Sequence, residues 1–236
     1  MVLLRTFFFF CLILCLTKSF SQQHIPDSFQ LVYQQDFEAP QVLSNIEMTD
    51  PNAWRIGLHE KGNYLELHQQ SDYEGAVRSP FNIAVFKDLL VGDFILEVEA
   101  NQNGREYGHR DLCFFFGIKD ASNFYYVHIA SQTDDHANNI FLVNDEPRIK
   151  ISAKTNAGNS WGAKESWHKV RIERSIQKGS IKVYFDDSST PIMEAEDHHF
   201  KIGMIGLGSF DDTGRFDNLK VWAPRVFSKK SQLFRE

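Results

Sequence analysis

The stretch HKVRIERSIQKGSIKVYF, residues 168–185, decides the fold class of this chain. Val170 and Ile172 alternate with charged residues in its first half, and Ile181 and Val183 continue the alternation in its second half. A period of two places the apolar residues on one face of a β-strand and the polar residues on the other. The intervening SIQKGS has the composition of a turn. The stretch therefore predicts a β-hairpin with one face on a hydrophobic core.

The same pattern recurs along the whole chain. DFILEVEA, residues 93–100, alternates over its full length, and runs rich in Phe, Tyr, Val and Ile follow at intervals of roughly 8–20 residues. No stretch has sustained helical periodicity, apart from a possible helical turn at AVFKDLL, residues 84–90. Such a series predicts an all-β fold, a two-sheet antiparallel β-sandwich of the jelly-roll type. Strands are predicted near 31–37, 63–68, 74–80, 93–100, 112–119, 123–130, 139–143, 167–175, 180–186, 191–195, 201–210 and 215–222.

The N-terminus has the pattern of a secretory signal peptide. Arg5 precedes an apolar run from Thr6 to Leu16, and the small residues Ser19 and Ser21 follow. The run is too short to span a bilayer, so a cleaved signal is expected, with no membrane span afterwards. A secreted or periplasmic location follows. The predicted division is a signal peptide at 1–21, an N-terminal lead at 22–27, one sandwich domain at 28–224 and a polar C-terminal tail at 225–236.

Charge and cysteine content narrow the function classes. Cleavage after residue 21 removes two basic residues and no acid, which changes the formal net charge from −6 to −8. No basic patch suited to phosphate contact is present, so no nucleic-acid partner is expected. Of the three cysteines only Cys113 remains, so an intramolecular disulfide is excluded. Cys113 lies in an apolar run and is expected to pack as a small hydrophobe. A monomer without an organic cofactor is predicted.

Two central runs are apolar on both faces. They are LCFFFGI at 112–118 and NFYYVHIA at 123–130. A strand of this kind needs the core on one face and an overhanging loop or a ligand groove on the other. In the second run Tyr125 belongs to the predicted core face, whereas Tyr126 and His128 belong to the opposite face. Aromatic rings beside an imidazole suit a sugar-binding groove, because sugar rings stack on aromatics while polar groups bind their hydroxyls.

The stretch SQTDDHANNIFLVNDEPR, residues 131–148, follows directly and is dense in polar groups. Its spacing matches no EF-hand calcium loop and no defined zinc pattern, so a glycan-binding or catalytic rim, a structural turn and a metal site remain open. As catalysis, Tyr126, His128 and His136 are candidate acid–base groups. The candidate substrate ligands are His109, Arg110, Asp111, Asp134, Asp135, Asn138 and Arg148, of which Arg110 or Arg148 would neutralise an anionic sugar.

The run KIGMIGLGSFDDTGRFDNLKVWAP, residues 201–224, resembles the closing hairpin of concanavalin A-like lectin/glucanase sandwiches. WHKVRIER, GSIKVYFDD and PIMEAED resemble the preceding strands of that superfamily, and LVYQQDFEAP with Trp54 resembles its beginning. The resemblance covers nearly the whole mature chain. The nearest groups are secreted domains related to 3-keto-disaccharide hydrolases and, more distantly, glycoside hydrolase family 16 and laminin G-like modules.

This resemblance implies a structural calcium ion on the convex side. The matching ligands here are Asp217, with Asp36 or Glu38 from the first strand, and hard oxygen donors of this kind suit calcium. One departure argues against a retaining glucanase, which uses an E-x-D-x-E strand. The only similar element is Glu97-Val98-Glu99, which lacks the aspartate and the third carboxylate.

The sequence therefore predicts an exported protein that binds a carbohydrate in the concave groove of a sandwich. One hypothesis is an enzyme that cleaves the glycan, either a keto-disaccharide hydrolase or a polysaccharide lyase, since a lyase needs a base, an acid and a partner for the uronate carboxylate. The alternatives are a non-catalytic glycan-binding or adhesion module and a structural domain with a calcium clip. The fold hosts all of them, so the site has to decide.

Overall fold

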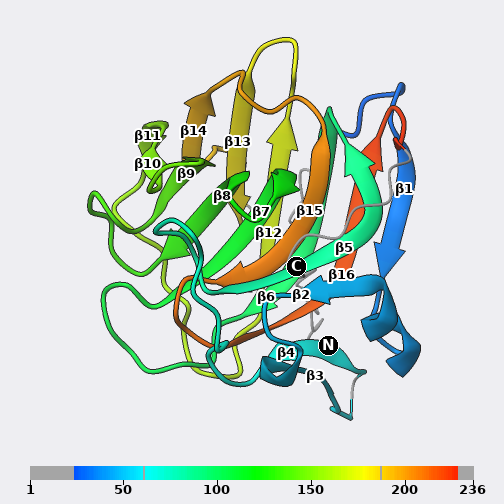
Figure 1. The fold of residues 1–236 in the computed structure, drawn as a ribbon, viewed down its shortest axis with the longest axis vertical. Coiled ribbons are helices and arrows are strands. Elements are labelled where there is room, and N and C mark those ends of the chain that lie inside the picture. Colours follow the sequence, from blue (N-terminus) through cyan, green and yellow to red (C-terminus); the bar gives the residue numbers. More distant parts are fainter. Residues whose placement is uncertain (1–23, 61, 187, 228–236) are drawn as a thin grey trace, which may run out of the picture.

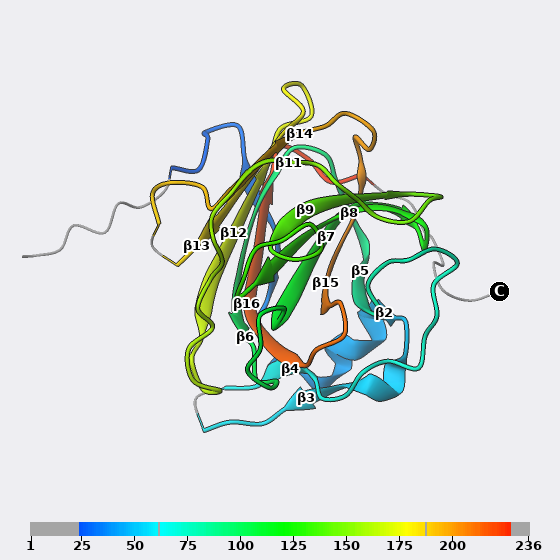
Figure 2. The ribbon, with the colours of Figure 1, turned by 90° about the vertical axis from the view of Figure 1, so that its left-hand side faces the viewer.

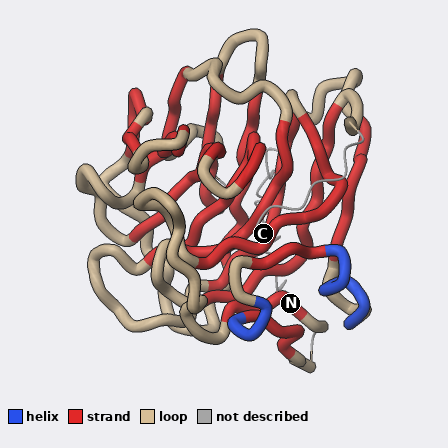
Figure 3. Tube along the Cα trace, viewed as in Figure 1, coloured by secondary structure: helices blue, strands red, loops and turns tan. Residues whose placement is uncertain are grey.

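The computed structural model describes residues 24–60, 62–186 and 188–227 and consists of two antiparallel β-sheets packed face to face. Figure 2 shows the two layers, with β6, β12, β13 and β16 in one and β5, β7, β8, β9 and β15 in the other. Only two short 3-10 turns, Pro40–Asn45 and Pro51–Ala53, interrupt the strands in the described residues (Figure 3). The predicted all-β, two-sheet antiparallel sandwich is confirmed.

The larger sheet contains nine strands among the described residues. Its order is β11-β14-β13-β12-β6-β16-β4-β3, and β1 pairs with β16 off this path, so the first and last strands lie side by side (Figure 1). The strands are β1 (Gln30–Gln35), β3 (Trp54–Gly57), β4 (Tyr64–Leu67), β6 (Phe94–Asn101), β11 (Ser152–Thr155), β12 (His168–Arg174), β13 (Ser180–Phe185), β14 (Met193–Glu196) and β16 (Gly214–Ala223).

The smaller sheet contains seven strands among the described residues, in the order β10-β9-β8-β7-β15-β5-β2. It positions the candidate site. The strands are β2 (Ile46–Met48), β5 (Asn82–Val91), β7 (Asp111–Asp120), β8 (Asn123–Ala130), β9 (Asn139–Asn144), β10 (Ile149–Lys150) and β15 (Gly203–Ser209).

The hairpin predicted from residues 168–185 forms as β12 and β13. Val170 pairs with Phe185 and Ile172 with Val183, and the four apolar side chains at 170, 172, 181 and 183 are buried in the core between the sheets. Gly179 closes the turn with a φ of 66°, a left-handed conformation that costs glycine little. The alternation of apolar and polar residues therefore correctly predicted both strands and the face of each strand that is buried.

Three local predictions were wrong. Residues 84–90 are not a helical turn but part of β5, which is interrupted by Asp88 at a φ of 63° and by a register shift opposite Met204 and Gly206. Residues 74–80 form no strand and run as an irregular segment. The expected closing hairpin at 201–224 is an arch, because β15 belongs to the smaller sheet and β16 to the larger.

The predicted segments at the two ends of the chain lie mostly outside the described residues. The signal peptide at 1–21 lies outside the described residues, as does the tail beyond residue 227. Within the described part, the backbone N–H of Phe227 donates to the carbonyl oxygen of Leu90 at 2.8 Å. No helix in that part has the length and apolar character needed to cross a membrane.

Candidate functional site

The two faces of β8 divide as the parity predicted. Tyr125, Val127 and Ile129 lie in the core between the sheets. Phe124 and Tyr126 lie on the outer face of the smaller sheet, in a second apolar cluster that we call the outer cluster. It consists of Ile83, Val85, Leu90, Cys113, Phe115, Ile118, Phe124, Tyr126, Phe141, Val143, Met204 and Phe210.

An overhanging segment covers part of the outer cluster. Val77 and Phe81 pack against it from the irregular segment before β5. The carbonyl oxygen of Arg78 accepts the backbone N–H of Arg148 at 3.1 Å, and the backbone N–H of Phe81 donates to the carbonyl oxygen of Phe210 at 3.0 Å. These contacts leave Tyr126 fully buried. The face that sequence reasoning left open as a loop cover or a groove is therefore largely covered.

A pocket of about 160 Å³, which we call the arginine pocket, remains at one end of this face. Its lining is mostly cationic or aromatic, with a single carboxylate from Asp211. Four segments that are distant in the sequence build it: the segment before β5, the loop before β7, the stretch from β8 to β10, and the arch between β15 and β16. The lining residues are Arg78, Tyr107, His109, His128, His136, Arg148, Phe210 and Asp211.

Arg148 is the best-positioned cation of this pocket. Its guanidinium lies over the rings of Phe210 and Phe141, with distances of 4.2 and 4.7 Å to the ring centroids. One Nη1–H donates to the hydroxyl of Tyr126 at 2.7 Å. The guanidinium of Arg78 also lies over Phe210, at 5.7 Å. Both arginines are thus held against one aromatic ring, an arrangement that cation–π attraction stabilises.

Tyr126 and His128 lie beneath the arginine pocket rather than free inside it. Tyr126 does not line the pocket, and burial raises the pKa of its hydroxyl well above the usual value. His128 reaches the lining although only 3% of its surface is exposed. Burial, together with the charge of Arg148, lowers the pKa of His128 to about 3. The imidazole is therefore neutral at physiological pH.

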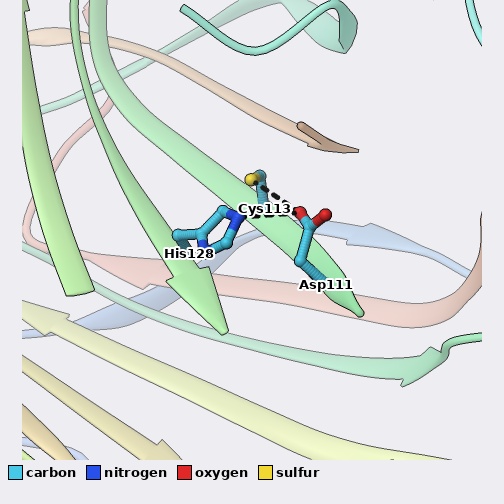
Figure 4. A group of neighbouring side chains, drawn as sticks. All are labelled: Asp111, Cys113 and His128. Atoms are coloured by element: carbon cyan, nitrogen blue, oxygen red, sulfur yellow. Dashed lines mark hydrogen bonds and ion pairs between the residues drawn. The ribbon is translucent and has the colours of Figure 1, made fainter. Parts of the chain in front are cut away.

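The hydrogen bonds of His128 also fix its tautomer. Nδ1 accepts the backbone N–H of Asn138 at 3.1 Å, so the single ring proton lies on Nε2. Nε2 faces Oδ2 of Asp111 at 3.4 Å (Figure 4). The same Oδ2 accepts the thiol of Cys113 at 3.3 Å and the backbone N–H of Phe210 at 2.9 Å. Nδ1 of His128 is therefore occupied within the protein, and Nε2 lies against the carboxyl group of Asp111.

The group formed by Asp111, Cys113 and His128 also has the spacing of a metal site. Its ligand atoms lie within 4.8 Å of one another. A tetrahedral zinc ion with bonds of about 2.0–2.3 Å separates its ligand atoms by about 3.3–3.8 Å, which matches the two distances to Oδ2. The tautomer opposes this use, because Nε2 carries the proton while Nδ1 is held by a donor. We therefore interpret the group as a buried hydrogen-bond cluster.

Asp111 links this cluster to the loop before β16. Burial and the neighbouring Asp212 carboxylate raise the pKa of Asp111 well above its usual range, and its Oδ1 has no hydrogen-bond partner in the described structure. Oδ2 of Asp212 accepts the backbone N–H of Asp111 and the hydroxyl of Tyr107, each at 2.9 Å. Asp111 and Asp212 therefore hold Tyr107 and Phe210 at the pocket and are not themselves exposed to it.

The loop after β8 supplies the rim. Oδ1 of Asp134 accepts the backbone N–H groups of His136 and Ala137, and its Oδ2 lies 2.5 Å from Nε2 of His109. Although partial burial opposes the shift, these contacts lower the pKa of Asp134. Asp135 points away and pairs with Lys150. Asp134 thus orients the ring of His109 and fixes the backbone at His136, whereas Asp135 forms a surface ion pair.

Asn138 ties two loops together below the rim. Its side chain is fully buried, and its backbone has a φ of 54°. The side-chain oxygen accepts the N–H of Ala130 at 3.2 Å and the amide of Asn159 at 2.8 Å. The side-chain amide donates to Thr133 at 2.6 Å and to Asn156 at 2.8 Å. Asn138 therefore positions the site without reaching it.

A second pocket adjoins the first at Tyr107, which lines both. Its volume is about 430 Å³, and we call it the Trp161 pocket. Arg110 lies in its wall and donates to the carbonyl oxygens of Gly162 and Gln102, which ties the loop before β7 to the loop before β12. The lining residues are Glu106, Tyr107, Arg110, Ser131, Gly158, Ser160, Trp161 and Gly162.

Several lining residues were missed by sequence reasoning. Phe210 and Arg78 were assigned to strands, Asp211 to the turn between two strands, and Tyr107 and Trp161 to no site. The motif NGREYGHRD contains Tyr107 in a polar loop, which was the one usable signal. The other missed residues reach the site through contacts between segments that are distant in the sequence, and a local sequence pattern cannot predict such contacts.

The carboxylates that the resemblance assigned to calcium lie at the junction of β1 and β16. Burial raises the pKa of Asp217 to about 6, and Glu99, Glu38 and Asp36 add to the shift. The amide of Asn218 bridges Glu99 and Asp217 at 3.0 and 3.3 Å. Within the described residues these oxygens do not form a group of three lying within 4.8 Å of one another. The donors suit calcium, but the side chains would have to close around it.

Comparisons with known proteins identify the fold. No protein-family model and no curated protein matches the sequence. Among solved structures, the carbohydrate-binding module CBM66 from Bacillus subtilis is 17% identical, with 74% of this chain and 93% of that chain covered and a TM-score of 0.51. Domain 4 of a GH43 extracellular arabinanase from Geobacillus stearothermophilus, in complex with arabinotriose, is 11% identical, with 84% and 95% covered and a TM-score of 0.51.

The winged bean acidic lectin, complexed with methyl-α-D-galactose, is 11% identical, with 82% of this chain and 98% of that chain covered and a TM-score of 0.51. These neighbours share the jelly-roll sandwich. The fold expected from the concanavalin A-like resemblance is therefore confirmed. Identities this low show the fold alone, so the site has to carry the function.

Proposed function

We propose that this protein binds a carbohydrate in the arginine pocket and the Trp161 pocket, which meet at Tyr107. The observation that carries the proposal is the arginine pocket itself. It combines an aromatic ring, Phe210, with guanidinium and imidazole groups on the outer face of a sandwich sheet. Aromatic surface and converging polar groups are what sugar sites use. Structural neighbours include a lectin and an arabinanase domain in complex with sugars.

The geometry favours binding over cleavage. A general base needs a free lone pair within hydrogen-bond reach of the substrate. His128 uses its lone pair on the N–H of Asn138, and Tyr126 lies below the pocket with its hydroxyl against Arg148. His136 is exposed on the rim and is the one member of the expected trio that can meet a ligand freely. We therefore propose a non-catalytic glycan-binding module, with cleavage as the alternative.

A glycan array followed by calorimetry tests this proposal. Ser160 is exposed in the lining of the Trp161 pocket, so Ser160→Trp should block the pocket without disturbing the core. Ser28→Trp, an exposed serine before β1, is the matched control. We expect wild type and Ser28→Trp to bind the same glycans and Ser160→Trp to lose them. Binding that survives in Ser160→Trp would contradict this placement.

Turnover is measured on the same glycans by mass spectrometry of the products. We expect intact oligosaccharides after incubation with the wild-type protein. Cleavage that is lost in His136→Ala while binding persists would replace our proposal with the enzymatic alternative.

We also retain calcium and export as proposals. The cluster around Asp217 carries excess negative charge, which a calcium ion would neutralise while linking the first and last strands. A chelator should then lower the melting temperature, and an unchanged value would remove this proposal. For export, the mass of the protein recovered outside the cytoplasm should correspond to a chain beginning near Gln22. Recovery of the full-length chain only from the cytoplasm would contradict it.

A further inference from the structure

We propose that the arginine pocket binds an acidic substituent of the glycan, a carboxylate or a sulfate group, with Arg148 as the principal ligand and Arg78 as the second. This inference rests on the proposed glycan binding and specifies the class of sugar.

The first observation is that neither arginine has an acidic partner. No carboxylate oxygen among the described residues lies within ion-pair distance of Arg78 or Arg148, although Arg148 is half-buried. A cation that is removed from water without an anion is costly, and such cations are usually paired. Elsewhere in this chain, the buried Arg171 has both Glu97 and Glu173. The buried Arg174 has no ion-pair partner among the described residues, but it donates to the backbone carbonyl oxygens of Gly179, Asp197 and Phe200. Arg148 has neither kind of partner, apart from the hydroxyl of Tyr126.

The second observation is that the guanidinium of Arg148 is held in place while most of its N–H groups have no acceptor among the described residues. The rings of Phe141 and Phe210 fix its plane, and Tyr126 accepts one Nη1–H. No acceptor for its other N–H groups exists among the described residues. A planar guanidinium with free, parallel N–H groups matches a carboxylate or a sulfate, which accept two such bonds together. A purely structural arginine would not need to leave these donors unused.

The charge of the lining supports an anion. Two permanent cations face one carboxylate, Asp211, which forms no ion pair with them in the described structure. Asp134 pairs with His109 on the rim and does not line the pocket. The backbone bond from Arg148 to Arg78 keeps the two cations on neighbouring segments. An incoming anion therefore meets a net positive surface in a partly dehydrated setting, where charge–charge attraction is stronger than in water.

The size of the pocket limits what enters it. A volume of about 160 Å³ is well below the roughly 300–1,000 Å³ of pockets for drug-sized ligands. It suits a single charged substituent and the ring edge that carries it. The adjoining Trp161 pocket is larger and has room for the neighbouring sugar, and Tyr107 lies at the junction. The acidic group would thus anchor one end of an oligosaccharide.

The test compares acidic oligosaccharides with matched neutral ones by isothermal titration calorimetry. One pair is a uronate oligosaccharide and its carboxyl-reduced form, and the other is a sulfated oligosaccharide and its desulfated form. We expect at least one acidic member to bind roughly ten- to hundredfold more tightly than its neutral partner, since hydrogen bonds to charged groups are the stronger ones. The pair that shows the preference identifies the acid as carboxylate or sulfate.

Three arginine variants show which side chain causes the preference for acidic oligosaccharides. Arg148→Met keeps the apolar stem and should abolish the preference, and Arg78→Met, at an exposed position, should weaken it without affecting folding. Arg55→Met, an exposed arginine of β3 in the other sheet, is the matched control and should leave it unchanged. Circular dichroism checks the fold of each variant. If Arg148→Met does not fold, Arg78→Met decides the assignment.

The outcomes separate the two proposals. Equal affinity for the acidic and neutral members of both pairs, or a preference that persists in Arg148→Met and Arg78→Met, overturns the acidic-sugar inference and leaves glycan binding intact. No binding of any glycan, acidic or neutral, overturns the proposed function and this inference with it.

Discussion

His128 should make the protein less stable as the solution becomes acidic. Its folded pKa is about 3, because it is buried and close to Arg148, whereas its unfolded pKa is 6.5. A group whose folded pKa is depressed contributes its full stability above the unfolded pKa and loses that contribution as the pH falls towards the folded pKa. The relevant window therefore runs from pH 6.5 down to pH 3.

The magnitude follows from the difference between the two pKa values. One proton taken up on unfolding lowers the free energy of unfolding by about 1.4 kcal/mol per pH unit within that window. Between pH 6.5 and pH 5 the loss attributable to His128 is therefore about 2 kcal/mol. This is a large part of the roughly 5–15 kcal/mol that folded domains possess.

Urea denaturation at pH 7.5, 6.5, 5.5 and 4.5 measures this loss when wild type is compared with His128→Gln. The glutamine has polar atoms of similar reach but does not titrate. We expect the variant to be less stable at pH 7.5 and to lose less stability than wild type on acidification. Asp111 has the opposite sign, since its raised pKa gives stability that is lost as the pH rises, but it is present in both proteins. Parallel pH profiles, or an NMR titration of the His128 ring near pH 6.5, would refute the reasoning.

Three further predictions concern other parts of the molecule. Asn138→Ala should lower the free energy of unfolding by about 2–4 kcal/mol in urea denaturation, because it leaves buried donors and acceptors unpaired. Asn138→Gly tolerates the positive φ and should recover only part of this loss, so full recovery would show that backbone strain dominates. Cys113 should resist alkylation in the native protein and react in denaturant, as followed by mass spectrometry, because burial and Asp111 raise its pKa well above the usual value; rapid native labelling would contradict its burial. Asp217→Asn should raise the melting temperature of metal-free protein at pH 7.5 more than at pH 4.5, since the stability contributed by a group with a raised folded pKa is lost as the pH rises through about 6. Calcium should then stabilise wild type and not Asp217→Asn, and an equal response of both would exclude Asp217 as a ligand.

The sequence predicted most of the fold because alternation reports directly on a half-buried strand. It failed at β5, where Lys87 and Asp88 are exposed in the middle of an otherwise buried strand. Several residues there have no counterparts on β15, so the strand bends and its apolar spacing imitates one turn of a helix. Residues 74–80 failed in the opposite way. They read EGAVRSP, with one β-branched residue, Val77, between Gly75 and Pro80, a composition that disfavours a regular strand. They cross the outer cluster without a β partner among the described residues.

The site was predictable only as far as strand parity extends. Parity correctly placed Tyr126 and His128 on the outer face of β8. It could not show that Phe210, from the arch before β16, and Arg78, from the segment before β5, close over that face. Such a cover depends on contacts between residues that are far apart in the sequence, such as Phe81 with Phe210 and Arg78 with Arg148. The roles of Asn138 and Arg110 escaped for the same reason, because a polar side chain in a loop looks alike whether it binds a ligand or another loop.

The protonation states of the pocket limit which chemistry could occur there. His128 is neutral, has its proton on Nε2 and uses its lone pair on Nδ1, so it can accept a substrate proton only by breaking its bond to Asn138. The remaining imidazoles are His109 and His136. Asp134 pairs with the ring of His109 and accepts only the backbone N–H of His136. A reaction at this site would therefore have to use the rim rather than the strand. The permanent charges of Arg78 and Arg148 need no such rearrangement, because they are already held against Phe210 with donors free. Recognition of an acidic sugar requires preorganised donors and no free base, and the two arginines supply such donors. Proton transfer requires a base with a free lone pair, which His128 lacks, so the pocket is better suited to binding.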